Sequence, residues 1–238
     1  MSCVAIIPAR GGSKRIPRKN IRSFYGKPII EHTILRAIET GIFQSVFVST
    51  EDLEIAKIAS KSGAEILHRN AGLSNDFATT VEVMANAVTE LDSLSTNNIE
   101  SACCIYPVNP NLNGERILQA QKLLNENELD YVFTAKRFQS TPARSLKMGP
   151  SGLSEMYYPE YLNSRSQDLP EYFHDAAMFY LGTSRAWRGK KPILNGNSKF
   201  IILDKYETMD IDDEEDWEMM EKLHLAQNSQ QEFGTPSD

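Results

Sequence analysis

Short apolar runs alternate with stretches of helical periodicity along the first 135 residues, and this alternation limits the folds that the chain can adopt. Val4–Pro8 and Ala102–Tyr106 are apolar throughout, which is typical of strands buried on both faces. Between them, Ile29–Glu39 and Thr79–Leu91 repeat apolar residues with a helical period, and Thr79 with Glu82 predicts a capping box. The same reasoning places strands at Ser45–Ser49, Glu65–Leu67, Tyr131–Ala135, Ala176–Leu181 and Phe200–Leu203, and helices at Glu54–Ser62, Glu115–Asn125 and Glu214–Leu225. Strands alternating with helices build a mostly parallel sheet covered on both faces, so we expect an α/β fold, a Rossmann-like sandwich of three layers.

Residues 136–172 interrupt this rhythm and are here called the arm. They are polar and rich in Pro, Gly and Tyr, with a turn at Gly149–Gly152 between two short extended stretches. We expect a protruding β-hairpin within a single domain over residues 1–228, followed by a flexible tail over residues 229–238. A free arm would expose apolar residues such as Met148 and Tyr157, and a two-fold interface would cover them. The chain is therefore expected to form a homodimer or a dimer of dimers, unless the arm folds back on its own sheet.

Composition excludes several classes of protein. A net charge of −7 argues against a nucleic-acid-binding surface, and no apolar run approaches the roughly 18 residues of a membrane span. Three cysteines cannot all pair, and they lie in apolar runs, so we expect reduced core thiols in a cytoplasmic protein. The first thirty residues carry seven Lys or Arg, whereas residues 210–221 carry eight carboxylates. If the two stretches meet, they form the charge layout that a metal–triphosphate needs.

A glycine-rich basic loop, Pro8–Arg15, follows the first predicted strand directly. Ligands of open α/β sheets bind beyond the carboxyl ends of the strands. Gly11 and Gly12 allow the backbone to turn and present N–H groups to an anion, while Arg10 and Lys14 supply positive charge. The loop has neither the Walker A pattern nor the dinucleotide-binding pattern. A phosphate site is the favoured interpretation, and a solvated basic loop is the alternative.

Asp210-Ile211-Asp212 ends an extended stretch near the C-terminus. Residues two apart on a strand point the same way, so both carboxylates can converge on one cation. The spacing alone slightly favours a purely structural role. The four acidic residues that follow, at positions 213–216, lie in the first turn of the last predicted helix, where the exposed N–H groups favour negative charge.

The stretch Ile6–Asn20, I-I-P-A-R-G-G-S-K-R-I-P-R-K-N, resembles the CTP-binding signature of the CMP-sialic acid synthetase family. The resemblance implies that Arg10, Gly11, Gly12, Ser13, Lys14 and Asn20 hold the triphosphate, with Lys19 nearby. The segment from Arg69 to Asp76 is similar to the one that wraps the cytosine in the family. Asp210 and Asp212 match its Mg²⁺-binding element. Arg10, Lys14 and Asp212 would then be the catalytic residues.

The sugar-binding region is the least specific part of this resemblance. Arg165 suits a sugar carboxylate, whereas Gln167, His174 and Asp175 suit hydroxyl or amide groups; a buried structural histidine is the alternative for His174. Residues 163–177 are similar to the branch of the family that acts on pseudaminic acid. Family members that act on N-acetylneuraminic acid have a glutamine where Tyr106 stands here, which favours the same branch. By the same resemblance, the arm of one subunit, at Arg144 or nearby, approaches the sugar held by the other.

The implied reaction is attack of a sugar anomeric hydroxyl on the α-phosphorus of CTP, with Mg²⁺ as cofactor. The partners are then CTP and an acidic nine-carbon sugar, most closely pseudaminic acid. N-Acetylneuraminic acid, legionaminic acid or an eight-carbon keto acid are alternative substrates. A non-catalytic nucleotide-binding regulatory protein is the alternative of another class, although such a protein is expected to lose some of the charged residues that this chain keeps.

Overall fold

Seven strands form the central sheet of the computed structural model, which describes residues 2–74, 77–94, 99–194 and 196–233. Along the sheet the order is β11-β7-β10-β6-β1-β4-β5. Its strands are β1 (Cys3–Pro8), β4 (Val46–Thr50), β5 (Glu65–His68), β6 (Ser101–Ile105), β7 (Tyr131–Arg137), β10 (Phe173–Thr183) and β11 (Ser198–Ile202). β10 alone runs antiparallel to its neighbours β6 and β7, while the other pairings are parallel. The predicted mostly parallel sheet is therefore confirmed.

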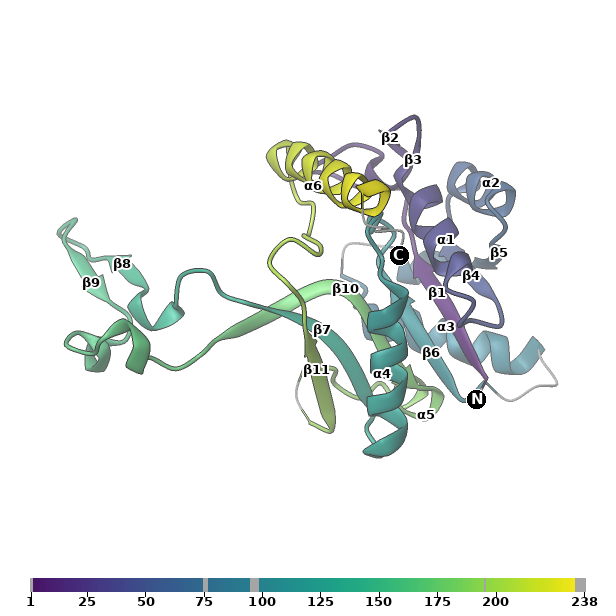
Figure 1. Ribbon diagram of the computed structural model, residues 1–238. Coiled ribbons are helices and arrows are strands. Elements are labelled where there is room, and N and C mark those ends of the chain that lie inside the picture. Colours follow the sequence, from purple (N-terminus) through teal and green to yellow (C-terminus); the bar gives the residue numbers. More distant parts are fainter. Residues whose placement is uncertain (1, 75–76, 95–98, 195, 234–238) are drawn as a thin grey trace, which may run out of the picture.

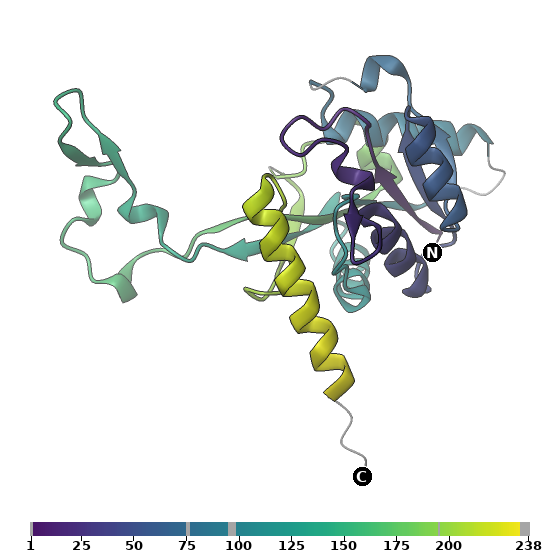
Figure 2. The same cartoon turned by 90° about the horizontal axis from the view of Figure 1, so that it is seen from above.

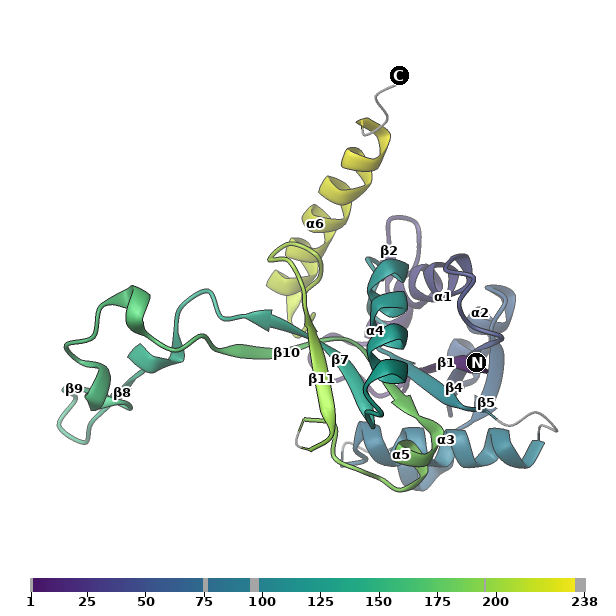
Figure 3. The same ribbon diagram turned by 60° about the horizontal axis from the view of Figure 1, so that its bottom comes forward.

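Helices cover both faces of this sheet, as Figure 3 shows from below. The helices are α1 (Ile29–Glu39), α2 (Leu53–Lys61), α3 (Thr80–Leu94), α4 (Gly114–Glu126), α5 (Ser184–Arg188) and α6 (Glu214–Phe233). Alternate residues of β1 face opposite layers, since Ala5 and Ile7 pack with α1, α2 and α4, whereas Val4 and Ile6 pack with α3 and α5. This alternation produces the three-layer sandwich that the sequence predicts.

A third apolar cluster joins the last helix to the loops beyond β1. Ile16 and Phe24 pack against Ile211, Trp217 and Met220, all of them buried. Phe24 belongs to a small hairpin formed by β2 (Ser23–Phe24) and β3 (Lys27–Pro28). α6 therefore lies at the end of the sheet where β1 finishes (Figure 1). The basic N-terminal loop and the acidic stretch before α6 are thereby brought together.

The sequence predicts the start of α3 correctly, but it does not predict where α6 ends. The capping box of α3 is formed as predicted, because the Thr79 backbone N–H donates to Glu82 Oε2 at 2.9 Å. The last helix extends to Phe233 instead of ending at Leu225, and it projects from the body in Figure 2. The expected tail therefore begins in helix, because no Gly or Pro interrupts residues 226–233; residues 234–238 lie outside the described residues.

The arm leaves the body at the end of β7 and returns at the start of β10. In Figures 1 and 2 it projects away from the sheet and does not fold back on it. Its tip is a hairpin of β8 (Leu146–Met148) and β9 (Ser154–Met156), joined through the predicted turn at Gly149–Gly152. Large apolar side chains on it are exposed, including Met148, 83% exposed, and Leu153, 70% exposed.

The three cysteines are unpaired and buried, as expected for core thiols. Burial raises the pKa of the Cys103 and Cys104 thiols well above the ordinary value, so both remain protonated. Over the described residues, no helix combines the length and the apolar character needed to cross a membrane.

Candidate nucleotide and metal site

A cleft of about 630 Å³ lies beyond the carboxyl ends of β1 and β6. Its walls come from the basic loop after β1, the loop after β6, the start of α3, the middle of β10 and the segment between β11 and α6. Predicted site residues that line it are Arg10, Ser13, Lys14, Lys19, Asn20, Arg69, Tyr106, Asp210 and Asp212. Residues from both ends of the chain thus meet around one cavity.

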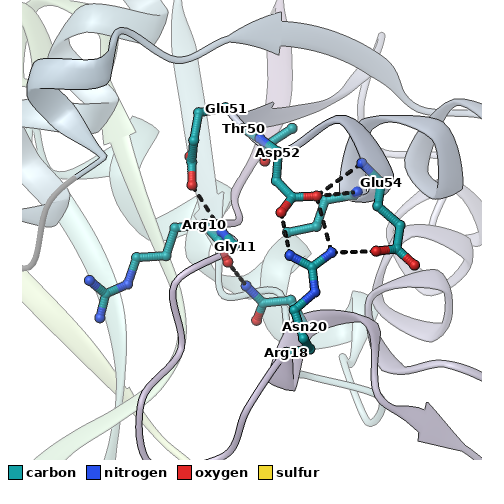
Figure 4. A network of polar contacts seen from close by, with 9 residues as sticks. Arg10, Gly11, Arg18, Asn20, Thr50, Glu51, Asp52 and Glu54 are labelled. Carbon is teal, nitrogen blue, oxygen red and sulfur yellow. Dashed lines mark hydrogen bonds and ion pairs between the residues drawn. The ribbon is translucent and has the colours of Figure 1, made fainter.

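The backbone of the basic loop is held from below by polar side chains. Asn20 Nδ2 donates to the Arg10 carbonyl oxygen at 2.9 Å. The Gly11 N–H donates to Glu51 Oε1, also at 2.9 Å. Figure 4 shows that the Arg10 side chain extends away from these contacts. Asn20 therefore shapes the loop through its backbone, in addition to lining the cleft.

Asp52 ties Arg18, which follows the basic loop, to the start of α2, a contact that sequence reasoning did not find. Its Oδ1 caps the helix by accepting from the backbone N–H groups of Glu54 and Ile55, at 2.9 and 3.0 Å. Its carboxylate also pairs with the Arg18 guanidinium, which reaches Glu54 at 2.6 Å (Figure 4). The bond from Arg18 lowers the pKa of Asp52. An Asp just ahead of the predicted helix Glu54–Ser62 was the available signal, since Asp is a common N-cap residue.

Arg69 enters the cleft from the end of β5. Its Nη2 donates to the Ser49 carbonyl oxygen at 2.7 Å, which ties the guanidinium to the end of β4. Burial lowers the pKa of Arg69, although the group remains charged at neutral pH. Asp76, expected to act with Arg69 around the base, lies outside the described residues.

Asp210 and Asp212 belong to the segment 204–212, which connects β11 to α6 and is called the acidic segment. Lysine ammonium groups hold its backbone: Lys19 Nζ donates to the Ile211 carbonyl oxygen at 2.5 Å. Lys136 Nζ donates to the carbonyl oxygens of Lys205, at 2.9 Å, and of Thr208. Lys19, expected near the triphosphate, is thus also a backbone anchor, and Lys136 was missed from the sequence.

The two carboxylates of the acidic segment are close enough for their charges to interact. Burial, and then the charge of Asp212, raise the pKa of Asp210. Arg15 pairs with Asp212 Oδ1 at 2.6 Å. Among the described residues, no group of three or more His, Cys, Asp or Glu side chains forms a complete metal cage. Two carboxylates that line one cleft are ligands of the kind that Mg²⁺ takes, with water and phosphate oxygens in its remaining positions.

The acidic residues after Asp212 serve the helix, as the sequence predicts. Asp213 Oδ1 accepts from the Asp216 N–H at 3.0 Å, and Asp216 Oδ2 accepts from the Asp213 N–H at 3.2 Å. This reciprocal pair caps α6. Glu214 pairs with Arg22 at 2.7 Å, so its charge is also used locally.

The structure does not gather the expected sugar-binding residues in one place within a single chain. Arg144, Arg165 and Gln167 are exposed on the arm, where Arg144 donates to the Ser164 carbonyl oxygen at 2.6 Å and Arg165 pairs with Asp168 at 2.7 Å. His174 is exposed at the base of the arm and donates to the Asp175 carbonyl oxygen, so it is not a buried histidine. Tyr106 lines the cleft itself.

A glycine-rich basic loop and two carboxylates across one cleft, at the carboxyl ends of a mostly parallel sheet, define an α/β protein built to hold a nucleotide phosphate chain. The sequence pattern of the family described as cytidylyltransferase matches residues 4–157. The chain belongs to the cytidylyltransferase family.

Known proteins of this family are similar over nearly the whole chain. Pseudaminic acid cytidylyltransferase of Campylobacter jejuni is 38% identical over 226 residues, covering 94% of this chain and 97% of that protein. CMP-N,N'-diacetyllegionaminic acid synthase of Legionella pneumophila is 28% identical over 237 residues, covering 94% and 96%. A solved structure of CMP:2-keto-3-deoxy-manno-octonic acid synthetase complexed with CTP has a TM-score of 0.69 at 14% identity, covering 96% of this chain and 100% of that one. It has the same fold.

Proposed function

We propose that this protein transfers the cytidylyl group of CTP to pseudaminic acid. The anomeric hydroxyl oxygen of the sugar attacks the α-phosphorus and forms a new P–O bond. The bond from the α-phosphorus to the bridging oxygen of the β-phosphate breaks, pyrophosphate leaves with the electron pair, and the hydroxyl proton passes to a base in the cleft. The products are the CMP-sugar and pyrophosphate.

The observation that carries this proposal is the meeting of Arg10 and Lys14 with Asp210 and Asp212 around one cavity. A triphosphate needs cationic groups along its oxygens, and the transfer needs charge neutralisation where pyrophosphate departs. The loop that carries Gly12 and Ser13 would face these oxygens, whereas the Gly11 N–H is already bonded to Glu51 and the Ser13 N–H to the Gly11 carbonyl oxygen. Arg69 lines the same cleft, as expected for a base-binding residue.

Asp210 and Asp212 are the residues that would hold Mg²⁺. The ion, when bound, would neutralise charge on the phosphate oxygens. Around it, Lys19 and Lys136 fix the backbone that carries the two carboxylates. Positioning by these residues would supply much of the acceleration, as in other transfers of phosphoryl type.

Pseudaminic acid is favoured as the sugar because the relative named for it is more similar, at 38% identity, than the relative named for a legionaminic acid, at 28%. Tyr106, in place of the glutamine expected for N-acetylneuraminic acid, agrees with this choice. CTP as a substrate and three reduced thiols favour a cytoplasmic location.

Incubation with CTP, Mg²⁺ and a panel of sugars tests the proposal. Pseudaminic acid should give a CMP-sugar, detected by mass spectrometry, with the highest kcat/KM. A higher value for legionaminic or N-acetylneuraminic acid would reassign the sugar. No product from any nonulosonic or eight-carbon acid, in a protein that still binds CTP, would support the regulatory alternative.

We further propose that two chains form a homodimer through their arms. The exposed apolar side chains at the hairpin are ones that an interface would cover, and the arm projects away from the sheet of its own chain (Figure 1). Light scattering at micromolar concentration should report a dimer or a dimer of dimers; a fully active monomer would contradict it. Mixing inactive Asp212→Ala and Arg144→Ala chains should restore partial activity if each site is shared. No recovery despite verified subunit exchange would assign each site to one chain.

A further inference from the structure

Strand β10 is irregular where it passes the cleft. Its register with β7 shifts between Asp175 and Tyr180. Inside this interval Ala177 has φ +51°, a left-handed conformation that disfavours any residue with a Cβ by about tenfold in population. Ala177 also lines the cleft. The strand therefore holds a strained backbone at the surface of the cleft.

The Asp175 carboxylate stabilises this conformation directly. Its Oδ1 accepts from the Ala177 N–H at 2.9 Å, a turn in which an aspartate bonds to the backbone two residues on. Its Oδ2 accepts from the Tyr180 hydroxyl at 2.5 Å, across the bulge. Both carboxylate oxygens are thus directed into the strand itself. Asp175, predicted from the sequence to bind the sugar, thus bonds to both ends of an irregular turn.

Tyr180 extends this contact to the opposite wall. Its ring centroid lies 5.5 Å from that of Tyr106, and the Tyr106 hydroxyl is 3.0 Å from Thr80 Oγ1 at the start of α3. Tyr106, Thr80 and Ala177 all line the cleft. Burial, with Tyr106 and Asp175 nearby, raises the pKa of Tyr180, so its hydroxyl remains a donor to Asp175 at working pH.

The bulge is also held from beneath. Asn109 Nδ2 donates to the Met178 carbonyl oxygen at 3.0 Å, and the Asn109 N–H donates to Thr33 Oγ1 on α1, also at 3.0 Å. Asn109 belongs to the loop after β6 and also lines the cleft. It therefore links this wall of the cleft to the irregular part of β10.

We propose that Asp175 is a positioning residue for the sugar end of the cleft: it holds Ala177 in the left-handed conformation and orients Tyr180 and Tyr106, without contacting the sugar. This inference rests on the proposed function, and it gives that site its specificity-determining wall. The wall lies at the base of the arm, between Tyr106 and the strand that leads from the arm residues. Loss of Asp175 should therefore affect the sugar more than the nucleotide.

The test compares Asp175→Ala with the double variant Asp175→Ala/Ala177→Gly. Glycine adopts positive φ at no steric cost, so it replaces the conformational support but no contact with a ligand. Asp175→Ala should raise the KM for the sugar about tenfold and change the KM for CTP less than about twofold; the double variant should recover most of the loss. Ala177→Gly alone is the reference for the missing methyl group. Glu171→Ala, which removes an exposed ion pair with Arg137 near the same strand, is the matched control.

A double variant as impaired as Asp175→Ala, with Ala177→Gly itself active, would overturn the proposal and assign Asp175 to the substrate. An unchanged sugar KM in Asp175→Ala would overturn it equally. Hydrogen exchange of the Ala177 amide supplies a readout that needs no substrate: exchange should accelerate at least about tenfold in Asp175→Ala. Unaltered exchange there contradicts the proposal even if no sugar is turned over, whereas absent turnover by the wild-type chain contradicts only the proposed function.

Discussion

Replacing Gly11 with alanine should disrupt the phosphate loop through one identifiable contact. An added Cβ would lie 2.3 Å from Asp52 Oδ2 and 3.2 Å from Arg18 Nη1. A flexible side chain would move aside, but Asp52 is held on two sides. Its other oxygen caps α2, and the carboxylate pairs with Arg18. Either the loop shifts or the cap is lost.

Both responses have a known cost. Overpacking of this kind costs about 1–3 kcal/mol, and loss of a helix cap costs about 0.5–2 kcal/mol. We expect Gly11→Ala to lower the free energy of unfolding by about 1–3 kcal/mol. For a chain of this length that corresponds to a fall in Tm of about 3–10 °C. Because the loop that would hold the triphosphate moves, the KM for CTP should rise at least about tenfold, equivalent to about 1.4 kcal/mol.

Thermal melts and the KM for CTP measure these effects, and the adjacent glycine supplies the control. A Cβ on Gly12 meets nothing within 4 Å, so Gly12→Ala should have a Tm close to that of the wild type. Asp52→Ser removes the clashing oxygen yet keeps a hydroxyl that can cap α2. In the Gly11→Ala background it should recover stability. Equal melting of the Gly11→Ala and Gly12→Ala variants, or no recovery in the double variant, would refute the reasoning.

Three further predictions concern the rest of the site and its support. Asp212→Ala should lower kcat at least about a hundredfold, with little change in Tm because an exposed ion pair contributes little stability. Glu215→Ala, in the same acidic stretch, should stay active. A fully active Asp212→Ala variant at limiting Mg²⁺ would refute the metal site. His224 is buried, and burial lowers its pKa to about 4, so between pH 6.5 and 5 the unfolded chain binds a proton at this site and the folded chain does not. The free energy of unfolding should therefore fall by about 1.5 kcal/mol from pH 6.5 to 5, as measured by urea titration. The His224→Gln variant should lack that part of the fall. Lys136→Met should leave two backbone carbonyls without a donor and accelerate amide exchange in the acidic segment, unlike Lys199→Met on β11; identical exchange in both variants would exclude the anchor.

Features with a local signal in the sequence were predictable. The expected helix Ile29–Glu39 coincides with α1, because apolar spacing and the following glycine define both its face and its end. The capping box at Thr79 needs only residues three apart. Arg10 and Asp212 were placed by the motifs that contain them, and the sheet brings both to one cleft.

Features that depend on distant partners were not predictable. An apolar run does not encode strand direction, so the antiparallel course of β10 had no sequence signal. Likewise, nothing local indicates that Lys136 holds the backbone of Thr208, 72 residues away. The Asp175 carboxylate can accept a hydrogen bond from a sugar hydroxyl, yet in the structure it accepts from two groups of its own strand, the Ala177 N–H and the Tyr180 hydroxyl. A sequence motif indicates which residues are available for binding, but the tertiary structure determines which contacts those residues make.

Pyrophosphate release with pseudaminic acid and each of CTP, ATP, GTP and UTP, in the presence of Mg²⁺, tests the central claim most directly. The proposed site predicts rapid release with CTP, much slower release with the other three nucleotides, and none when the sugar is omitted. Equal release with all four would leave a phosphate site without base recognition. Release from CTP in the absence of any sugar would contradict the proposed transfer.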